Sequence, residues 1–112
     1  MTSARRFASV SLLAMTVALG ATALPAIADA IGDRMEIHLD GGIRSGQDVL
    51  KALCLGAKGT YIGRPFLYGL GAFGKQGVTM ALDIIRKELD VTLALCGKRL
   101  IAEAGPDLLY KG

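Results

Sequence analysis

The residues best suited to chemistry in this sequence lie in two glycine-rich turns that each carry an arginine. The first turn is Asp40-Gly-Gly-Ile-Arg-Ser-Gly46, and the second is Gly63-Arg64, twenty residues after Arg44. Glycine lets backbone N–H groups approach an anion, and the N-terminus of a following helix adds a positive dipole. A guanidinium binds phosphate through two parallel hydrogen bonds. The two turns together therefore predict a site for one phosphate group.

These turns need strands and a helix to bring them together. Residues 35–40 alternate and are β-prone, and residues 60–62 form a second short β-prone run. If the two strands are parallel neighbours, a right-handed crossover places both turns at the same edge of the sheet. A plainer interpretation stays open, in which the glycines only make tight turns and the arginines pair with Asp40 or Asp48.

The helix between the strands has a recognisable start and end. Ser45-Gly-Gln-Asp48 is a capping-box pattern, in which the serine hydroxyl accepts from the Asp48 amide and the aspartate reaches back. Gly56 is placed to end the helix. Its apolar residues are expected on one face: Val49, Leu50, Leu53, Cys54 and Ala57.

Further helices are expected on both sides of this unit. Pro25 opens a short apolar helix over residues 26–31, and residues from Lys98 onward are expected to form a loop. Three helical segments are expected between these two regions and after the second strand: residues 65–70, 78–89 and 91–96. The order is helix, strand, helix, strand, helix, which predicts an α/β fold built on one βαβ unit.

Length and composition exclude several classes of protein. The chain has 112 residues, which suits one small domain, whereas a complete (β/α)₈ barrel needs roughly 250. Its formal net charge of +3 comes from scattered basic residues without interleaved aromatics, so no nucleic-acid partner is expected. The two cysteines, Cys54 and Cys96, form neither a disulfide framework nor a metal site, and we expect both to pack as reduced apolar groups.

The first 23 residues form a separate apolar segment. Arg5 and Arg6 precede an uncharged stretch that contains Ala21-Thr-Ala23, and Ala28-Asp-Ala30 follows. A basic start, an apolar run and an A-x-A triplet are typical of a secretory signal. Two other interpretations remain, namely an accidental lead-in and a buried helix. We expect a cytoplasmic protein, with export or membrane association through residues 1–30 as the alternative.

The residues from Leu39 to Phe66, LDGGIRSGQDVLKALCLGAKGTYIGRPF, resemble the final βαβ segment of FMN-dependent α-hydroxy acid dehydrogenases. This family includes flavin-type L-lactate dehydrogenase and glycolate oxidase. The continuation Gly63-Arg-Pro-Phe-Leu-Tyr-Gly69 is more particular to that group, and the resemblance runs from about Leu24 to Leu109. It implies that residues 24–112 are the C-terminal βαβα fragment of a TIM (β/α)₈ barrel, with residues 1–23 as the lead-in.

The same resemblance implies FMN as the cofactor. The two glycine-arginine turns match the family's FMN-contacting turns on the phosphate side of the flavin. Asp40 would orient Arg44 or a ribityl hydroxyl. The implied cofactor-binding residues are Asp40, Gly41, Gly42, Ile43, Arg44, Gly63 and Arg64.

The sequence also departs from the family pattern. The family's catalytic base is a histidine in a Ser-Asn-His-Gly-Gly-Arg motif, which is absent here. His38 lies within a strand and lacks that motif, so we expect a packing or surface residue and assign no catalytic residue. The resemblance therefore implies an FMN-binding part of an L-lactate-like dehydrogenase or oxidase that is inactive alone. A 2-hydroxy acid would bind only in a complete enzyme.

The sequence leaves two other functions open. A non-enzymatic truncated remnant and an exported small domain that binds a phosphorylated ligand are the two alternatives. A homo-oligomer is a further possibility.

Overall fold

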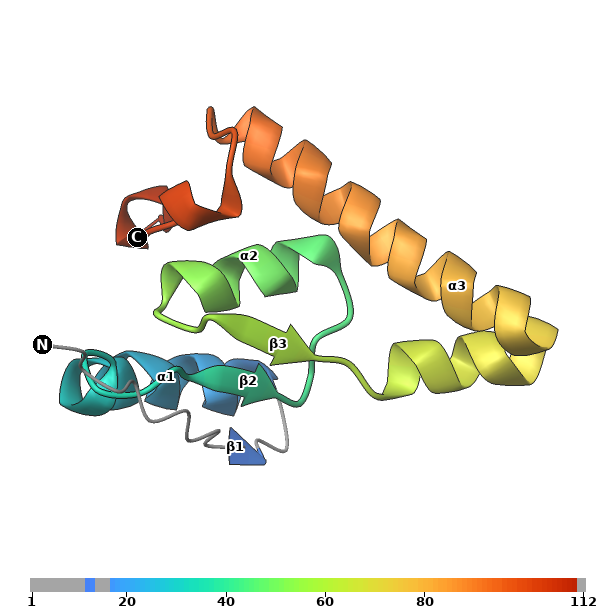
Figure 1. Cartoon of the computed structure of the whole chain (residues 1–112), viewed down its shortest axis with the longest axis horizontal. Coiled ribbons are helices and arrows are strands. Elements are labelled where there is room, and N and C mark those ends of the chain that lie inside the picture. Colours follow the sequence, from blue (N-terminus) through green and yellow to red (C-terminus); the bar gives the residue numbers. More distant parts are fainter. Residues whose placement is uncertain (1–11, 14–16, 111–112) are drawn as a thin grey trace, which may run out of the picture.

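The computed structural model describes residues 12–13 and 17–110. Figure 1 shows strands and helices alternating along the chain, with the long helix α3 folded back over the rest. The strands and helices are β1 (Leu12–Leu13), α1 (Val17–Ile31), β2 (His38–Asp40), α2 (Gly46–Cys54), β3 (Gly59–Tyr61) and α3 (Arg64–Leu95). Two 3₁₀ turns follow, at Ile101–Glu103 and Pro106–Leu108.

The strands form one parallel sheet in the order β1-β2-β3. Asp40 pairs with Tyr61 in the register of β2 and β3, so the expected unit of strand, helix and parallel strand is confirmed. The sheet also includes β1, which pairs with β2 and comes from the stretch interpreted as a lead-in. Arg5, Arg6 and the rest of residues 1–11 and 14–16 lie outside the described residues.

Helix α1 is longer than expected, and the prediction that it begins at Pro25 is wrong. It begins at Val17 and contains Pro25, which removes one backbone hydrogen bond from the helix. Leu24 is 1% exposed and packs with Ile37 and Leu39 in the main core cluster. Burial of this apolar side chain offsets the cost of the internal proline. Among the described residues, no helix is both long and apolar enough to cross a membrane.

Strand β2 is shorter than expected, because the residues before it form a turn that continues α1. The backbone N–H groups of Arg34 and Met35 both donate to the carbonyl of Ile31, at 2.9 Å each. They extend the end of α1 by a turn, and the predicted strand over 35–40 is therefore reduced to His38–Asp40.

Helix α2 begins as the capping-box pattern predicted. The Asp48 amide donates to Ser45 Oγ at 3.2 Å, and Asp48 Oδ2 accepts from the amide of Arg44 at 3.1 Å. Gly56, with φ of 112°, follows the end of the helix as expected.

Helix α2 is buried on two sides. The prediction of one apolar face was therefore incomplete. Ala52 packs toward α1 and β2, whereas Leu50 and Cys54 pack against Leu93 of α3. Leu53 is only half-buried and belongs to neither cluster. Helix α2 therefore lies between the sheet and α3 (Figure 1).

Helix α3 is a helical hairpin. Phe73 (φ −140°) and Gly74 (φ 60°) break it into segments of residues 64–72 and 75–95. The expected helices over 65–70 and 78–89 lie within these segments, but the separate helix over 91–96 is wrong. The second segment runs unbroken to Leu95, because no glycine or proline occurs between Gly77, near its start, and Gly97 (φ 75°).

The tail from Lys98 is more ordered than the expected loop. Lys98 forms an ion pair with Asp107 at 3.2 Å, and Leu108 and Leu109 pack onto the cluster around Leu50 and Cys54. Both cysteines are free; Cys54 is buried as expected, but Cys96 is exposed, so the prediction that it packs inside is wrong.

Candidate functional site

Both predicted turns leave the same edge of the sheet. Strands β2 and β3 are parallel neighbours, and their last residues, Asp40 and Tyr61, are paired. The first turn begins directly after Asp40, and Gly63 lies two residues after Tyr61. Figure 1 shows α2 and α3 starting from this edge. The structure therefore brings the two ends of the predicted anion site to one side of the fold.

The first turn depends on two glycines with left-handed backbones. Gly41 has φ of 107° and Gly42 has φ of 76°, which are backbone conformations that residues other than glycine rarely adopt. Ile43 is 2% exposed and packs in the main core cluster, so it anchors the turn. Asp40 is half-buried and Arg44 is exposed. Ile43 thus has a structural role, while Arg44 faces solvent.

The N-terminus of α2 is already capped by acceptors of the chain itself. Ser45 and Asp48 form the capping hydrogen bonds given above, and the backbone N–H of Gly46 donates to Glu88 Oε2 at 2.8 Å. Glu88 lies on α3, 42 residues away in sequence. Two carboxylates therefore meet the positive end of the α2 dipole.

The N-terminus of α3 is open by contrast. Its N-cap residue is Gly63, and no side chain caps the first turn. A Cβ built on Gly63 would meet nothing within 4 Å, and Arg64 is exposed. Uncapped amides at a helix N-terminus beside a guanidinium are donors that suit an anion.

The two arginines of the site have no acidic partner in the part of the chain that the structure describes. The ion pairs there join Arg34 to Asp33, His38 to Glu36, and Lys98 to Asp107. Neither Arg44 nor Arg64 pairs with Asp40 or Asp48, so the plainer interpretation of the arginines is not seen. Because Asp40 forms no ion pair with Arg44, the Asp40 carboxylate does not orient the Arg44 guanidinium. Both guanidinium groups are available for a phosphate, and the donor set fits FMN's phosphate group.

His38 lies at the other end of β2 from the first turn. Its ring lies 5.7 Å from the ring of Tyr61, and its Nε2 is 3.7 Å from Glu36 Oε2. The side chain is 29% exposed. These contacts agree with the expected role as a strand residue. No cluster of metal-ligating side chains occurs over residues 12–13 and 17–110.

Sequence reasoning missed Glu88 as part of this region. It is one of several charged residues on an amphipathic helix, and nothing local distinguishes it from Asp83 or Asp90. Only the fold-back of α3 brings its carboxylate to Gly46. A glycine in the first turn of a helix was the available signal, because it allows a second helix to approach closely.

Comparison with known proteins places the chain in a family. The FMN-dependent dehydrogenase family matches residues 16–111, and the chain belongs to this family. An L-lactate dehydrogenase of Caulobacter vibrioides is 53% identical over 89 residues, covering 80% of this chain and 23% of the relative. The oxidoreductase family and its cofactor, FMN, were thus predicted correctly from the sequence.

Solved structures agree with this assignment. The flavin-binding domain of baker's yeast flavocytochrome b2 is 46% identical with a TM-score of 0.71, covering 82% of this chain and 24% of that chain. An oxidized active mutant of (S)-mandelate dehydrogenase is 36% identical with a TM-score of 0.78, covering 82% and 26%. The chain spans about a quarter of the length of these relatives.

Proposed function

We propose that this chain is the flavin-phosphate-binding part of an FMN-dependent 2-hydroxy acid dehydrogenase or oxidase. One observation carries the proposal. Two turns leave the same sheet edge beside the N-terminus of α3, which no side chain caps. Each turn carries an exposed arginine, Arg44 or Arg64, that forms no ion pair with any described residue. Family membership supplies the identity of the phosphate-bearing ligand.

Within this site, each part of the chain has a distinct role. The amides near Gly42 and Gly63 donate to phosphate oxygens, and the Arg64 guanidinium binds them with two hydrogen bonds. Arg44 adds a second positive charge, and Asp40 binds a ribityl hydroxyl. Ile43 holds the first turn against the core. The bound flavin would supply the redox chemistry by accepting a hydride equivalent from the substrate.

The proposed substrate class is a 2-hydroxy acid of the L-lactate type. Support comes from the relatives, which include L-lactate dehydrogenases and a mouse 2-hydroxyacid oxidase 46% identical over 87 residues. We place this chain as the C-terminal βαβα portion of a (β/α)₈ barrel. Parallel β2 and β3 with α2 between them have the form of a barrel's repeating unit.

We propose that this chain alone does not oxidise a 2-hydroxy acid. A general base must lie within hydrogen-bond reach of the proton that it removes. His38, the single histidine, is at the far end of β2 from the first turn, and its ring lies beside Glu36 and Tyr61. The 2-hydroxy acid would therefore bind and react only when the rest of a barrel is present.

We also propose a cytoplasmic location. Cleavage after Ala23 would cut through α1, and cleavage after Ala30 would remove Leu24, a core residue that is 1% exposed. Retention of α1 is the arrangement that keeps the main core cluster intact. Mass spectrometry of the N-terminus of the expressed protein tests this, and a mature chain that begins after Ala30 would contradict it.

The proposed function is tested by comparing FMN with riboflavin, which lacks the phosphate. The full chain is titrated into each flavin and followed by flavin fluorescence, alone and with the unmatched part of the Caulobacter relative. We expect FMN to bind at least about tenfold more tightly than riboflavin, the order that charge-assisted hydrogen bonds provide. No binding in either mixture, or equal affinity for the two flavins, would overturn the proposal.

A further inference from the structure

One contact joins the site to a distant part of the chain. Glu88, in the second segment of α3, accepts the backbone N–H of Gly46 at 2.8 Å, and this contact is partly buried. Gly46 is the first residue of α2 and lies two residues after Arg44. The side chain of Glu88 therefore binds the backbone at the point where the first turn enters α2.

The close approach of α3 makes this contact specific to residue 46. A Cβ built on Gly46 would lie 2.6 Å from Glu88 Cβ and would also collide with the backbone N of Leu89. Only glycine lets the backbone of α3 come so near the start of α2. The fold thus holds Glu88 at the α2 N-terminus through backbone contact as well as through its carboxylate.

The charge at this point favours one phosphate position over another. Glu88 places a carboxylate at the Gly46 amide that opens α2, and Asp48 places a second one at the Arg44 amide just before the helix. An anion would otherwise bind at this helix end. No side chain caps the first turn of α3, which carries Arg64. A phosphate is therefore repelled from the α2 N-terminus and attracted to Gly63 and Arg64.

We propose that Glu88 is a positioning residue for the phosphate site. It fixes the first turn by binding the Gly46 amide, and its negative charge directs the phosphate to the α3 N-terminus. This inference rests on the proposed function, because it assumes that the anion belongs to FMN.

Hydrogen exchange of the chain complemented by the unmatched part of the Caulobacter relative tests the positioning without any flavin. In Glu88→Ala, we expect the Gly46 amide to exchange at least about tenfold faster, as for the loss of a hydrogen bond to a charged acceptor. Glu88→Gln keeps a carbonyl acceptor and should restore protection. Asp83→Ala removes an exposed charge from the same helix and should change nothing. Fast exchange of Gly46 in the wild type, or equal exchange in Glu88→Ala, would overturn the inference.

Flavin affinity separates positioning from a general loss of structure. In the titration described above, Glu88→Ala should weaken FMN about tenfold and leave riboflavin unchanged, because only the phosphate meets the displaced turn. Glu88→Gln should bind FMN at least as tightly as the wild type. Equal losses for both flavins would show that Glu88 is merely structural. Failure of the wild type to bind FMN, with Gly46 still protected, would overturn the proposed function and not the contact.

Discussion

Gly69 and Gly77 bring the two segments of α3 into direct backbone contact. A Cβ built on Gly77 would collide with the carbonyl oxygen of Gly69, and one built on Gly69 would collide with that of Gly77. The hairpin turns at Gly74 between them, where φ is 60°. This crossing sends the second segment back over α2, and it therefore determines where Glu88 lies.

Gly77→Ala should destabilise the hairpin. The added methyl group meets backbone atoms that cannot rotate away, and overpacking of this kind costs ~1–3 kcal/mol. The measurement is the urea concentration at which half of the helical circular-dichroism signal is lost. Gly71→Ala is the matched control, because a Cβ there meets nothing within 4 Å. It should be neutral or stabilise the helix by up to ~1 kcal/mol. A Gly77→Ala midpoint at or above that of Gly71→Ala would contradict the crossing.

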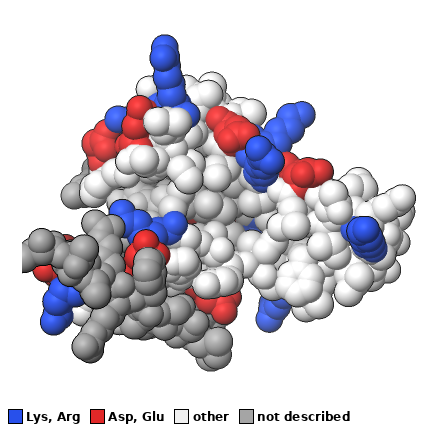
Figure 2. Space-filling model, viewed as in Figure 1, with Lys and Arg blue, Asp and Glu red and all other residues white. Residues whose placement is uncertain are grey.

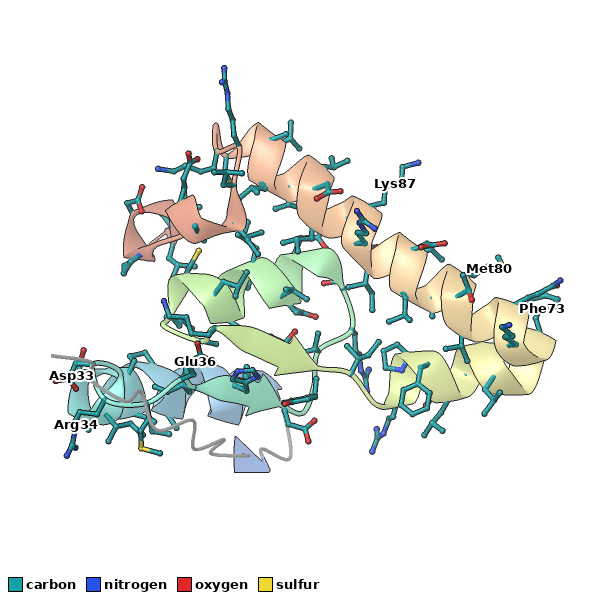
Figure 3. The ribbon with its side chains drawn as sticks, in the orientation of Figure 1. Asp33, Arg34, Glu36, Phe73, Met80 and Lys87 are labelled. Carbon is teal, nitrogen blue, oxygen red and sulfur yellow. The ribbon has the colours of Figure 1, made fainter. Side chains whose placement is uncertain are left out.

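The chain expressed alone should fold only marginally. Large apolar side chains of the α3 hairpin are at least half exposed, among them Leu67 (53%), Phe73 (69%) and Met80 (53%). Figure 2 shows that this end of the molecule carries few charged side chains, and Figure 3 shows Phe73 and Met80 on the hairpin. In the described sheet, β3 is paired only on the side of β2. Exposed patches and open strand edges promote association.

We therefore expect oligomers and a broad unfolding transition. Light scattering after size exclusion gives the mass, and urea titration gives the width of the transition. A sharp two-state transition at the monomer mass would contradict this expectation.

The two cysteines should differ in reactivity. Burial is the largest cause and raises the pKa of the Cys54 thiol; a hydrogen bond with the Gly105 backbone lowers this pKa, and Asp107 and Cys96 add smaller raising effects. The reactive thiolate of Cys54 is thus disfavoured in the folded chain, whereas Cys96 is exposed. Iodoacetamide at pH 8 should modify Cys96 first, as read by peptide mass spectrometry. In Cys96→Ser, labelling of Cys54 should appear only as urea unfolds the chain; prompt labelling without urea would contradict its burial.

The purified chain with added FMN should not oxidise L-lactate, glycolate or mandelate. The reason is that the sequence lacks the family's Ser-Asn-His-Gly-Gly-Arg motif and that the single histidine, His38, contacts Glu36. A general base contributes ~10²–10⁴-fold in rate. The assay follows bleaching of the flavin absorbance without oxygen, with free FMN as the control. Turnover above that control would show that this chain holds catalytic groups of its own.

Local signals in the sequence predicted the part of the fold that forms the site. The capping box at Ser45–Asp48 and the stop at Gly56 fixed α2, because these residues satisfy the helix ends through neighbours in the chain. Strand β3 was placed within one residue, at 59–61 instead of 60–62. Both glycine-arginine turns follow from those elements.

Features that depend on distant contacts could not be predicted in this way. Helix α1 passes through Pro25 because Leu24 is buried against Ile37 and Leu39, which lie beyond the next turn. The capping of Gly46 by Glu88 needs the fold-back of α3 at Gly74. Neither the proline signal nor the charge pattern contains that information.

The most direct test of the phosphate site compares FMN affinity in the wild type, Arg64→Ala and His38→Ala. The flavin-fluorescence titration uses the chain complemented by the unmatched part of the Caulobacter relative. Arg64→Ala should weaken FMN binding roughly ten- to a hundredfold, since a charge-assisted hydrogen bond contributes ~1.5–3 kcal/mol. His38→Ala should leave binding nearly unchanged. Equal affinity for wild type and Arg64→Ala, or a larger loss at His38, would contradict the placement of the phosphate at the α3 N-terminus.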